Sequence, residues 1–337
     1  MNITRRHMLR TTAGLAMGAL LSGGLVGCAQ GAKNMAGSTL DTSDKKTIYT
    51  TFFPVYDLTK RVVGDRMDVK TIIKGNQEPH DFELQTSDMA AVSDADLIIF
   101  NGAGMEAFID DLKGVVHDDN KFLDLSEGLT LLEGGGHDHD EHDHNDEHDD
   151  HEDHDDHDHK EHSSVNPHTW LSIKNAMYEL QAIYEKVAAL DPEHAEEYQQ
   201  NYEQELRGFK ALDARFESEL SQVKSTERYF VVSHAAFNYL AHDYQLKQVA
   251  VTGISPDEEP SAAELATIAD FVKAHNITTI FFEGKATPKV AQTLAENTHV
   301  KTGTLYTMES LTDEEAELGY LRLMEQNLDA LLDSLNA

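Results

Sequence analysis

The sequence is poor in cysteine and in basic residues, and both shortages narrow the possible functions. Its one cysteine, Cys28, excludes an intramolecular disulfide and a metal site built from several thiolates. Only 27 Lys and Arg residues face 61 Asp and Glu residues, which gives a formal net charge of −34. Because nucleic-acid binding needs a basic surface that neutralises phosphates, this balance argues against a nucleic-acid partner and favours cations.

The sequence also lacks a hydrophobic run apolar enough for a strong membrane-spanning helix. Residues 1–27 contain three arginines followed by a small, apolar stretch, which is typical of a secretory signal peptide. The end of this segment, Leu25-Val26-Gly27-Cys28, resembles the lipobox of bacterial lipoproteins, which implies cleavage before Cys28 and a lipid anchor on that cysteine. The stretch "TRRHMLR" leaves export by the Sec or the Tat route open. Residues 28–45 are then expected to form a flexible tether.

Eight short apolar, β-branched runs alternate with helical patterns along the rest of the chain. Strands that alternate with helices form parallel sheets covered on both faces. The pattern therefore predicts an α/β fold with two lobes, each a mainly parallel sheet flanked by helices, at residues 46–171 and 227–337. The predicted strands are 46–52, 67–73, 95–100, 121–125, 228–234, 247–253, 278–283 and 302–307.

Linking helices are expected between the lobes, at residues 172–226, and one of them is unusually long. Asp191 is a suitable N-cap residue, and the proline and the acid that follow it suit a first helical turn. Apolar residues then recur every three or four positions as far as Val223. Residues 192–224 therefore predict a spine helix on the order of 45 Å long. A rigid spine favours lobes that tilt relative to each other, and it argues against lobes that close like a clamp.

Three histidines and one glutamate stand where a predicted strand gives way to the next element. His80 lies in "EPHDFE", beyond the second predicted strand, and His168 lies in "NPHTWL". His234 and Glu283 each end a predicted strand of the second lobe. Since ligands bind at the carboxyl ends of parallel strands, these side chains are expected to converge. Three imidazoles and a carboxylate suit tetrahedral Zn²⁺. Five other histidines are interpreted as structural: His117, His194, His242, His275 and His299.

A low-complexity run from residue 137 to residue 162 contains ten histidines and fourteen acidic residues. Such a composition cannot bury a core, so residues 134–164 are predicted to be a disordered insertion in the first lobe. Neutral imidazoles ligate metal and the acids attract cations, which favours auxiliary zinc capture over an inert loop. A flexible run loses entropy on binding, so it is expected to hold zinc more weakly than a preformed site. The ten histidines are His137, His139, His142, His144, His148, His151, His154, His157, His159 and His162.

A family resemblance lies in four stretches of the sequence: "EPHDFE", "NPHTWL", "VVSHAAFNYLAHDYQLKQVAVTGISPDEEPSA" and "FFEGKATPKVAQTLAENTHVKTGTL". Through them the chain resembles the cluster A-I metal-binding lipoproteins of ABC importers, in particular the zinc-specific (ZnuA/AdcA-type) branch. The resemblance implies that His80, His168, His234 and Glu283 bind Zn²⁺. It also implies an extracytoplasmic, non-enzymatic, monomeric solute-binding protein whose partner is an ABC transporter permease. Asp81 and Asn166 are expected to orient the imidazoles by hydrogen bonds without touching the metal.

Three other functions stay open at this point. The same family contains manganese or other divalent-metal receptors and proteins labelled as adhesins. Manganese-binding members typically carry carboxylates at both of the last two ligand positions, so His234 favours zinc. A zinc hydrolase needs an open coordination position for water, which a fourth ligand at Glu283 would close. We therefore expect a zinc receptor without catalytic activity.

Overall fold

The computed structural model describes residues 45–75, 77–134, 165–258, 260–283 and 289–337. The predicted signal peptide, Cys28, nearly all of the tether and the ten histidines of the low-complexity run lie outside these residues. Ser43–Ala337 forms one compact unit. In the described part of this unit, no helix combines the length and the apolar character that crossing a membrane requires.

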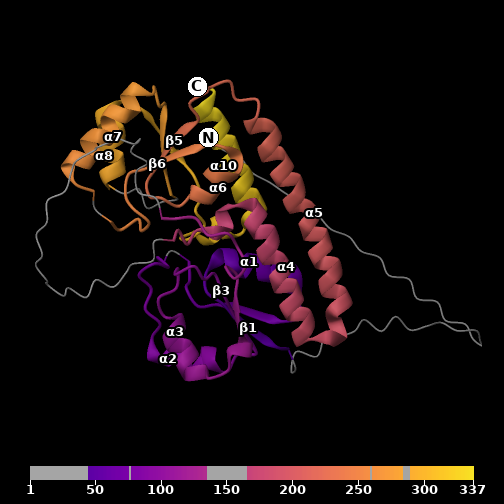
Figure 1. Ribbon diagram of the computed structural model, residues 1–337. Helices are drawn as coiled ribbons and strands as arrows, with labels where there is room; N and C mark the ends of the chain where they lie inside the picture. Colours follow the sequence, from indigo (N-terminus) through magenta and orange to yellow (C-terminus); the bar gives the residue numbers. More distant parts are fainter. Residues whose placement is uncertain (1–44, 76, 135–164, 259, 284–288) are drawn as a thin grey trace, which may run out of the picture. The chain divides into compact units, whose positions relative to one another are not determined.

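Four parallel strands form the first sheet, in the order β2-β1-β3-β4 (Figure 1). All four residues of β3, Leu97–Phe100, are buried, because an inner strand of a sheet covered on both faces is apolar on both sides. The other strands are β1 (Thr47–Thr50), β2 (Asp68–Thr71) and β4 (Phe122–Asp124). Three helices connect them: α1 (Phe53–Val63), α2 (Thr86–Ser93) and α3 (Ile109–Val116).

The second sheet repeats this arrangement in the order β6-β5-β7-β8, again with parallel pairs. Its strands are β5 (Tyr229–Val232), β6 (Lys247–Ala250), β7 (Thr279–Phe282) and β8 (Lys301–Thr304). Its helices are α6 (Asn238–Tyr244), α7 (Ala262–Ala274), α8 (Lys289–Thr298), the short α9 (Asp313–Ala316) and α10 (Gly319–Leu335). Every strand overlaps one of the eight predicted runs, and the predicted two-lobed α/β fold is confirmed.

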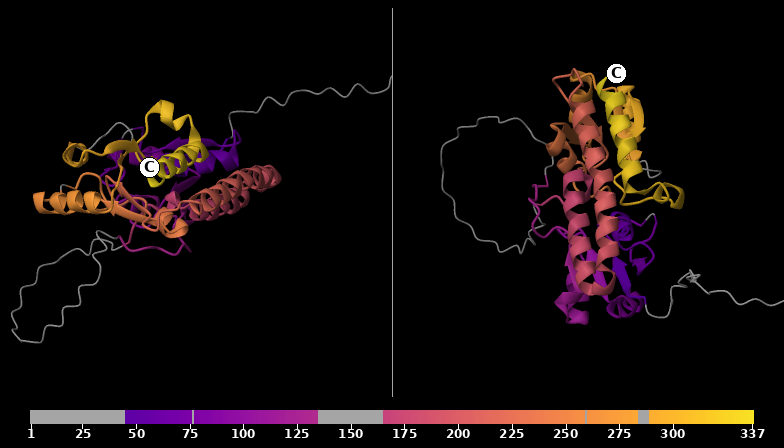
Figure 2. Two further views of the ribbon diagram at one scale, coloured as in Figure 1. Left: turned by 90° about the horizontal axis from the view of Figure 1, so that it is seen from above. Right: turned by 90° about the vertical axis from the view of Figure 1, so that its right-hand side faces the viewer.

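Two long helices, α4 (Ile173–Leu190) and α5 (Ala195–Leu220), pack side by side (Figure 2). The predicted spine at residues 192–224 is shorter at both ends in the structure: Pro192–His194 forms a 3₁₀ turn before α5 begins, and α5 ends at Leu220. This turn is held by Asp191, whose carboxylate accepts a hydrogen bond of 2.7 Å from the Tyr198 hydroxyl. The 26 residues of α5 correspond to a rod of about 39 Å.

Helix α5 packs against helices that belong to both sheets. The Asn201 side chain donates a hydrogen bond of 2.9 Å to the carbonyl oxygen of Val62, at the end of α1. Farther along α5, the Phe209 ring stacks on Tyr320 of α10 with ring centroids 5.2 Å apart. One buried apolar cluster includes residues of both sheets together with α4, α5 and α10. The long helix therefore shares its core with both halves of the fold.

Candidate metal centre

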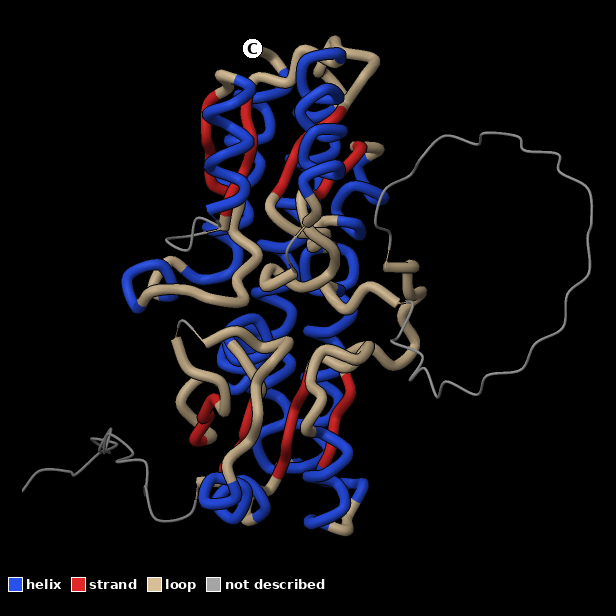
Figure 3. Tube along the Cα trace, turned by 90° about the vertical axis from the view of Figure 1, so that its left-hand side faces the viewer, coloured by secondary structure: helices blue, strands red, loops and turns tan. Residues whose placement is uncertain are grey.

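Loops that leave the strands of the two sheets meet between them (Figure 3). His80 lies in the loop after β2, and His234 lies two residues beyond the end of β5. His168 directly precedes the 3₁₀ turn Thr169–Leu171, which leads into α4. Parallel strands direct their carboxyl ends to the same edge, which explains why residues distant in sequence arrive together.

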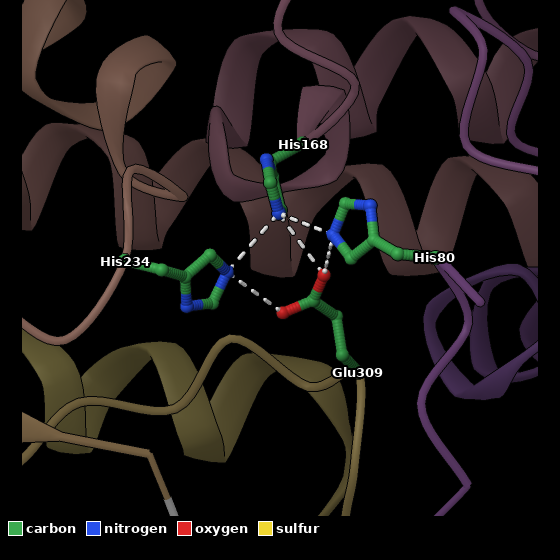
Figure 4. Close-up of side chains that lie close together, drawn as sticks. All are labelled: His80, His168, His234 and Glu309. Carbon is green, nitrogen blue, oxygen red and sulfur yellow. Dashed lines mark hydrogen bonds and ion pairs between the residues drawn. The ribbon is translucent and has the colours of Figure 1, made fainter. Parts of the chain in front are cut away.

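The three histidines point the same ring atom at one another (Figure 4). The Nε2 atom of His168 lies 3.2 Å from Nε2 of His80 and 3.2 Å from Nε2 of His234. The side chains of His168 and His234 are fully buried, and that of His80 is 11% exposed. The structure thus brings together the three histidines that the sequence analysis selected, and His80 faces the solvent side.

Glu309 supplies the carboxylate that completes the group. Its Oε1 atom lies 3.0 Å from Nε2 of both His80 and His168, and its Oε2 atom lies 3.3 Å from Nε2 of His234. The Glu309 side chain is fully buried, and Oε2 accepts no hydrogen bond; its approach to His234 is an ion pair only. A buried carboxylate oxygen without a hydrogen bond costs free energy unless a cation balances it.

The spacing of these donors fits a small tetrahedral cation. Zinc bonds of 2.0–2.1 Å to nitrogen or oxygen place neighbouring ligand atoms about 3.3–3.4 Å apart in a tetrahedron. The closest pairs in the group lie 3.0–3.3 Å apart, and all four ligand atoms lie within 4.8 Å of one another. Small outward shifts of the rings would therefore produce zinc geometry without a change of fold.

Hydrogen bonds on the far side of two rings fix their orientation. The Nδ1 atom of His168 donates to the Asn166 side-chain oxygen at 2.8 Å, and the Asn166 amide in turn donates to the carbonyl of Ala235 at 2.6 Å. The Nδ1 atom of His234 donates to Oε1 of Glu283. Each ring is therefore turned so that its Nε2 atom faces the group, and metal binds there once that nitrogen carries no proton.

Burial and charge act in opposite directions on the acid–base groups of the centre. Burial lowers the pKa of His168 to about 4, so its imidazole is neutral at neutral pH. Burial also opposes a charge on His234, but the carboxylates of Glu283 and Glu309 outweigh it and raise the pKa of His234 well above its usual value. The same histidines hold the pKa of Glu309 well below its usual range despite its burial. The centre therefore offers Glu309 as a carboxylate.

Glu283 lies next to the group but outside it. Its carboxylate is on the Nδ1 side of His234 and accepts a second hydrogen bond, of 2.5 Å, from the Ser233 hydroxyl. Asn166 takes the orienting position expected of it, whereas Asp81 is exposed. Glu309 was not among the residues predicted from the sequence; it lies in the loop after β8, beyond the carboxyl end of a strand, which is the only sequence signal that points to it.

A network of buried polar side chains supports the loop that carries His168. The Asn101 amide donates to the carbonyl of Pro167 at 2.8 Å, and the Thr169 hydroxyl lies within hydrogen-bond distance of Asn101 Oδ1 and Glu179 Oε1, at 3.1 and 2.9 Å. Burial raises the pKa of Glu179 to about 8. The loop that carries His168 is thus held in place by the buried side chains of Asn101 and Glu179.

The fold and the centre define a binding protein that places a metal-ligand set between two α/β sheets. A family described as the periplasmic component A of the zinc-uptake complex, ZnuA, matches residues 48–334. The chain therefore belongs to the ZnuA family.

Individual relatives agree with this assignment. The chain is similar to the high-affinity zinc uptake system protein ZnuA of Bacillus subtilis, with 39% identity over 314 residues that cover 92% of this chain and 94% of the relative. It is 38% identical over 295 residues to the zinc-binding lipoprotein AdcA of Streptococcus pneumoniae, covering 85% of this chain but only 55% of AdcA. The Zn(II)-bound ZnuA-like domain of Streptococcus pneumoniae AdcA has a similar structure, with a TM-score of 0.71, 34% identity and coverage of 87% of this chain and 100% of that domain.

Proposed function

We propose that the protein captures Zn²⁺ outside the cytoplasm, at His80, His168, His234 and Glu309, and passes it to the membrane permease of an ABC transporter. The observation that carries the proposal is the Oε2 atom of Glu309, which is buried without a hydrogen-bond partner. A cation at the middle of the group would satisfy this oxygen together with the lone pairs of three imidazoles. The names of the zinc-uptake relatives support the same cargo.

Zinc is the metal that the donor set suits best. Three nitrogens and one oxygen favour zinc over manganese, which binds preferentially to oxygen ligands. Membership in a family of zinc-uptake complex components supports a permease as the partner.

Four donors also fill a tetrahedral shell and leave no position at which a metal-bound water could be activated. Catalytic zinc sites keep such a position open. The proposed role is therefore binding and delivery without catalysis, by a monomer that Cys28 anchors to the outer face of the membrane.

Zinc affinity, measured by competition with a chromophoric chelator, tests the ligand set. We expect His168→Ala and Glu309→Ala to weaken zinc binding by more than about 100-fold, because each removes a direct donor. Glu283→Gln is expected to cost about 10–100-fold, because it removes only the partner that orients His234.

The matched control is His242→Ala, because His242 is 69% exposed and lies outside the group; it is expected to bind zinc as the wild type does. If Glu309→Ala kept wild-type affinity while Glu283→Gln abolished binding, the fourth ligand would be Glu283. Competition between Zn²⁺ and Mn²⁺ on the wild type tests the choice of metal.

A further inference from the structure

The indole of Trp170 forms a hydrogen bond that crosses from the loop of His168 to the loop of Glu309. Its Nε1 atom donates to the carbonyl oxygen of Thr307 at 2.7 Å. Trp170 is 1% exposed and Thr307 is 2% exposed, so no water competes for this bond. Trp170 lies two residues after one candidate ligand, and Thr307 lies two residues before another.

The main chain of Trp170 is held as firmly as its side chain. The Tyr320 hydroxyl donates to the Trp170 carbonyl oxygen at 2.5 Å. The Trp170 ring meets Phe52 edge-on, with centroids 4.9 Å apart, and lies 5.4 Å from the His168 ring. The indole N–H is therefore a fixed donor on a packed ring, and it is directed at Thr307.

The backbone between Thr307 and Glu309 has an uncommon conformation. Met308 has a φ of 67°, in the left-handed region that a residue with a long side chain seldom adopts, and it is 1% exposed. Such a conformation persists only where the surroundings enforce it, and it often marks a functional site. The next residue is Glu309, whose carboxylate points at the group of histidines.

Contacts with two segments distant in sequence hold the residues directly before Met308. On one side, Asn327 brackets Tyr306: its oxygen accepts from the Tyr306 amide at 2.7 Å, and its nitrogen donates to the Tyr306 carbonyl at 2.9 Å. On the other side is the bond from Trp170 to Thr307. The loop is thus fixed to α10 by Asn327 and to the His168 segment by Trp170.

We propose that Trp170 is a positioning residue for the metal centre: its indole N–H holds the Thr307 carbonyl so that Glu309 points at the three histidines. This inference rests on the proposed zinc-binding function. Trp170 does not touch the metal; it acts through Thr307 and Met308 on Glu309. It also makes the position of Glu309 depend on the segment that carries His168, so that the two ligands are placed together.

A double-mutant cycle on the purified mature protein tests the proposal, with zinc affinity measured by chelator competition. Trp170→Phe keeps an aromatic ring but removes the donor, and we expect it to weaken zinc binding about 10–100-fold, as removal of an outer-shell partner does. In a Glu309→Ala background, Trp170→Phe should cause little further loss, because the residue that it positions is gone.

Phe52→Leu is the matched control, since it changes the packing around the indole and leaves the indole N–H in place; it is expected to lose thermal stability without a comparable loss of zinc affinity. If Trp170→Phe does not fold, Asn327→Leu releases the same loop from α10 and should show the same dependence on Glu309. Wild-type zinc affinity in Trp170→Phe, or an equal loss in both backgrounds, overturns the proposal. If wild type and His168→Ala bind zinc equally, the proposed function itself fails, and this inference fails with it.

Discussion

The amide of Leu311 donates a hydrogen bond of 3.2 Å to the carbonyl oxygen of Gly75. Gly75 precedes His80 in the loop after β2, and Leu311 follows Glu309 in the loop after β8. One backbone bond therefore connects the loop that carries His80, the most exposed histidine of the group, with the loop that carries Glu309. Because these loops are connected to each other, we expect them to respond to the metal as a unit.

Hydrogen exchange on zinc-loaded and chelator-treated protein should show this response. We expect zinc to increase the protection of amides in residues 77–83 and 305–311, because the metal cross-links the two loops. Amides in the middle of α5 should exchange equally in both states, since α5 lies within the shared core. Loss of protection along α5 on zinc removal would indicate that the helix bends and that the lobes move about a hinge.

Deletion of residues 136–163 should leave the tight site intact. The flanking residues Glu133 and Val165 form an antiparallel bridge, and the Asn166 amide donates to the Leu132 carbonyl at 2.8 Å. Glu133 and Val165 are therefore already adjacent, and three residues (134, 135 and 164) would join them in the shortened chain, so we expect the deletion to leave Asn166 in place. Calorimetry should show one tight zinc in both proteins and weaker zinc ions in the full-length protein alone. Loss of the tight zinc on deletion would place the primary site in the histidine-rich run.

A change of one ligand should shift the metal preference. Replacement of the His234 nitrogen by a carboxylate moves the donor set toward the oxygen ligands that manganese prefers. Because Glu283 lies directly behind His234, a new carboxylate there would face an existing one, so the informative variant is His234→Glu with Glu283→Gln. We expect the ratio of zinc to manganese affinity to fall by at least about tenfold relative to Glu283→Gln alone. An unchanged ratio would mean that His234 does not set the preference.

The stability of the metal-free protein should depend on pH through Glu179. Burial raises the pKa of Glu179 from 4.5 to about 8, so between these values the folded state binds more protons than the unfolded state. The Glu179 contribution to stability is therefore full below pH 4.5 and is lost as the pH rises toward 8. Each pKa unit corresponds to about 1.4 kcal/mol, so a few kcal/mol depend on this group.

Urea unfolding of wild type and Glu179→Gln at pH 5 and pH 8, with chelator present, measures this effect. The loss of unfolding free energy between the two pH values should be smaller in the variant, because glutamine does not titrate. Glu185→Gln, at an exposed position on the same helix, should behave as the wild type does. Parallel pH profiles for wild type and Glu179→Gln would show that Glu179 is ionised in the folded protein at both pH values.

The predictions from sequence worked best where the physical signal is periodic. The inner strands β3, β5 and β7 are short apolar runs that are largely buried, and burial on both faces of a sheet requires that pattern whatever the loops do. The long spine helix is present, but it begins three residues later than predicted, because Pro192 opens a 3₁₀ turn, and it ends four residues earlier, at Leu220. The orienting role of Asn166 was also predictable, because Asn166 lies only two residues before His168 and its side chain can reach few other groups.

The carboxylate ligand of the centre, Glu309, was harder to predict than the strands and the histidines. Glu283 follows β7 directly, so the strand pattern places it near the group, but the pattern does not tell which ring nitrogen it reaches. Glu309 lies in the loop after β8, and the left-handed backbone of Met308 directs it inward. Such a turn depends on contacts with Trp170 and Asn327, which are distant in sequence. Local sequence patterns do not encode those contacts.

The chain contains a single tryptophan, and this residue is Trp170, whose ring lies 5.4 Å from that of His168. Light absorbed and emitted by tryptophan therefore comes from one place in the molecule, directly beside the metal centre. Trp170 is therefore an intrinsic fluorescence probe of the metal centre. Zinc arrival and departure can be followed by intrinsic fluorescence in the unlabelled protein, including in stopped-flow experiments in which the permease is added.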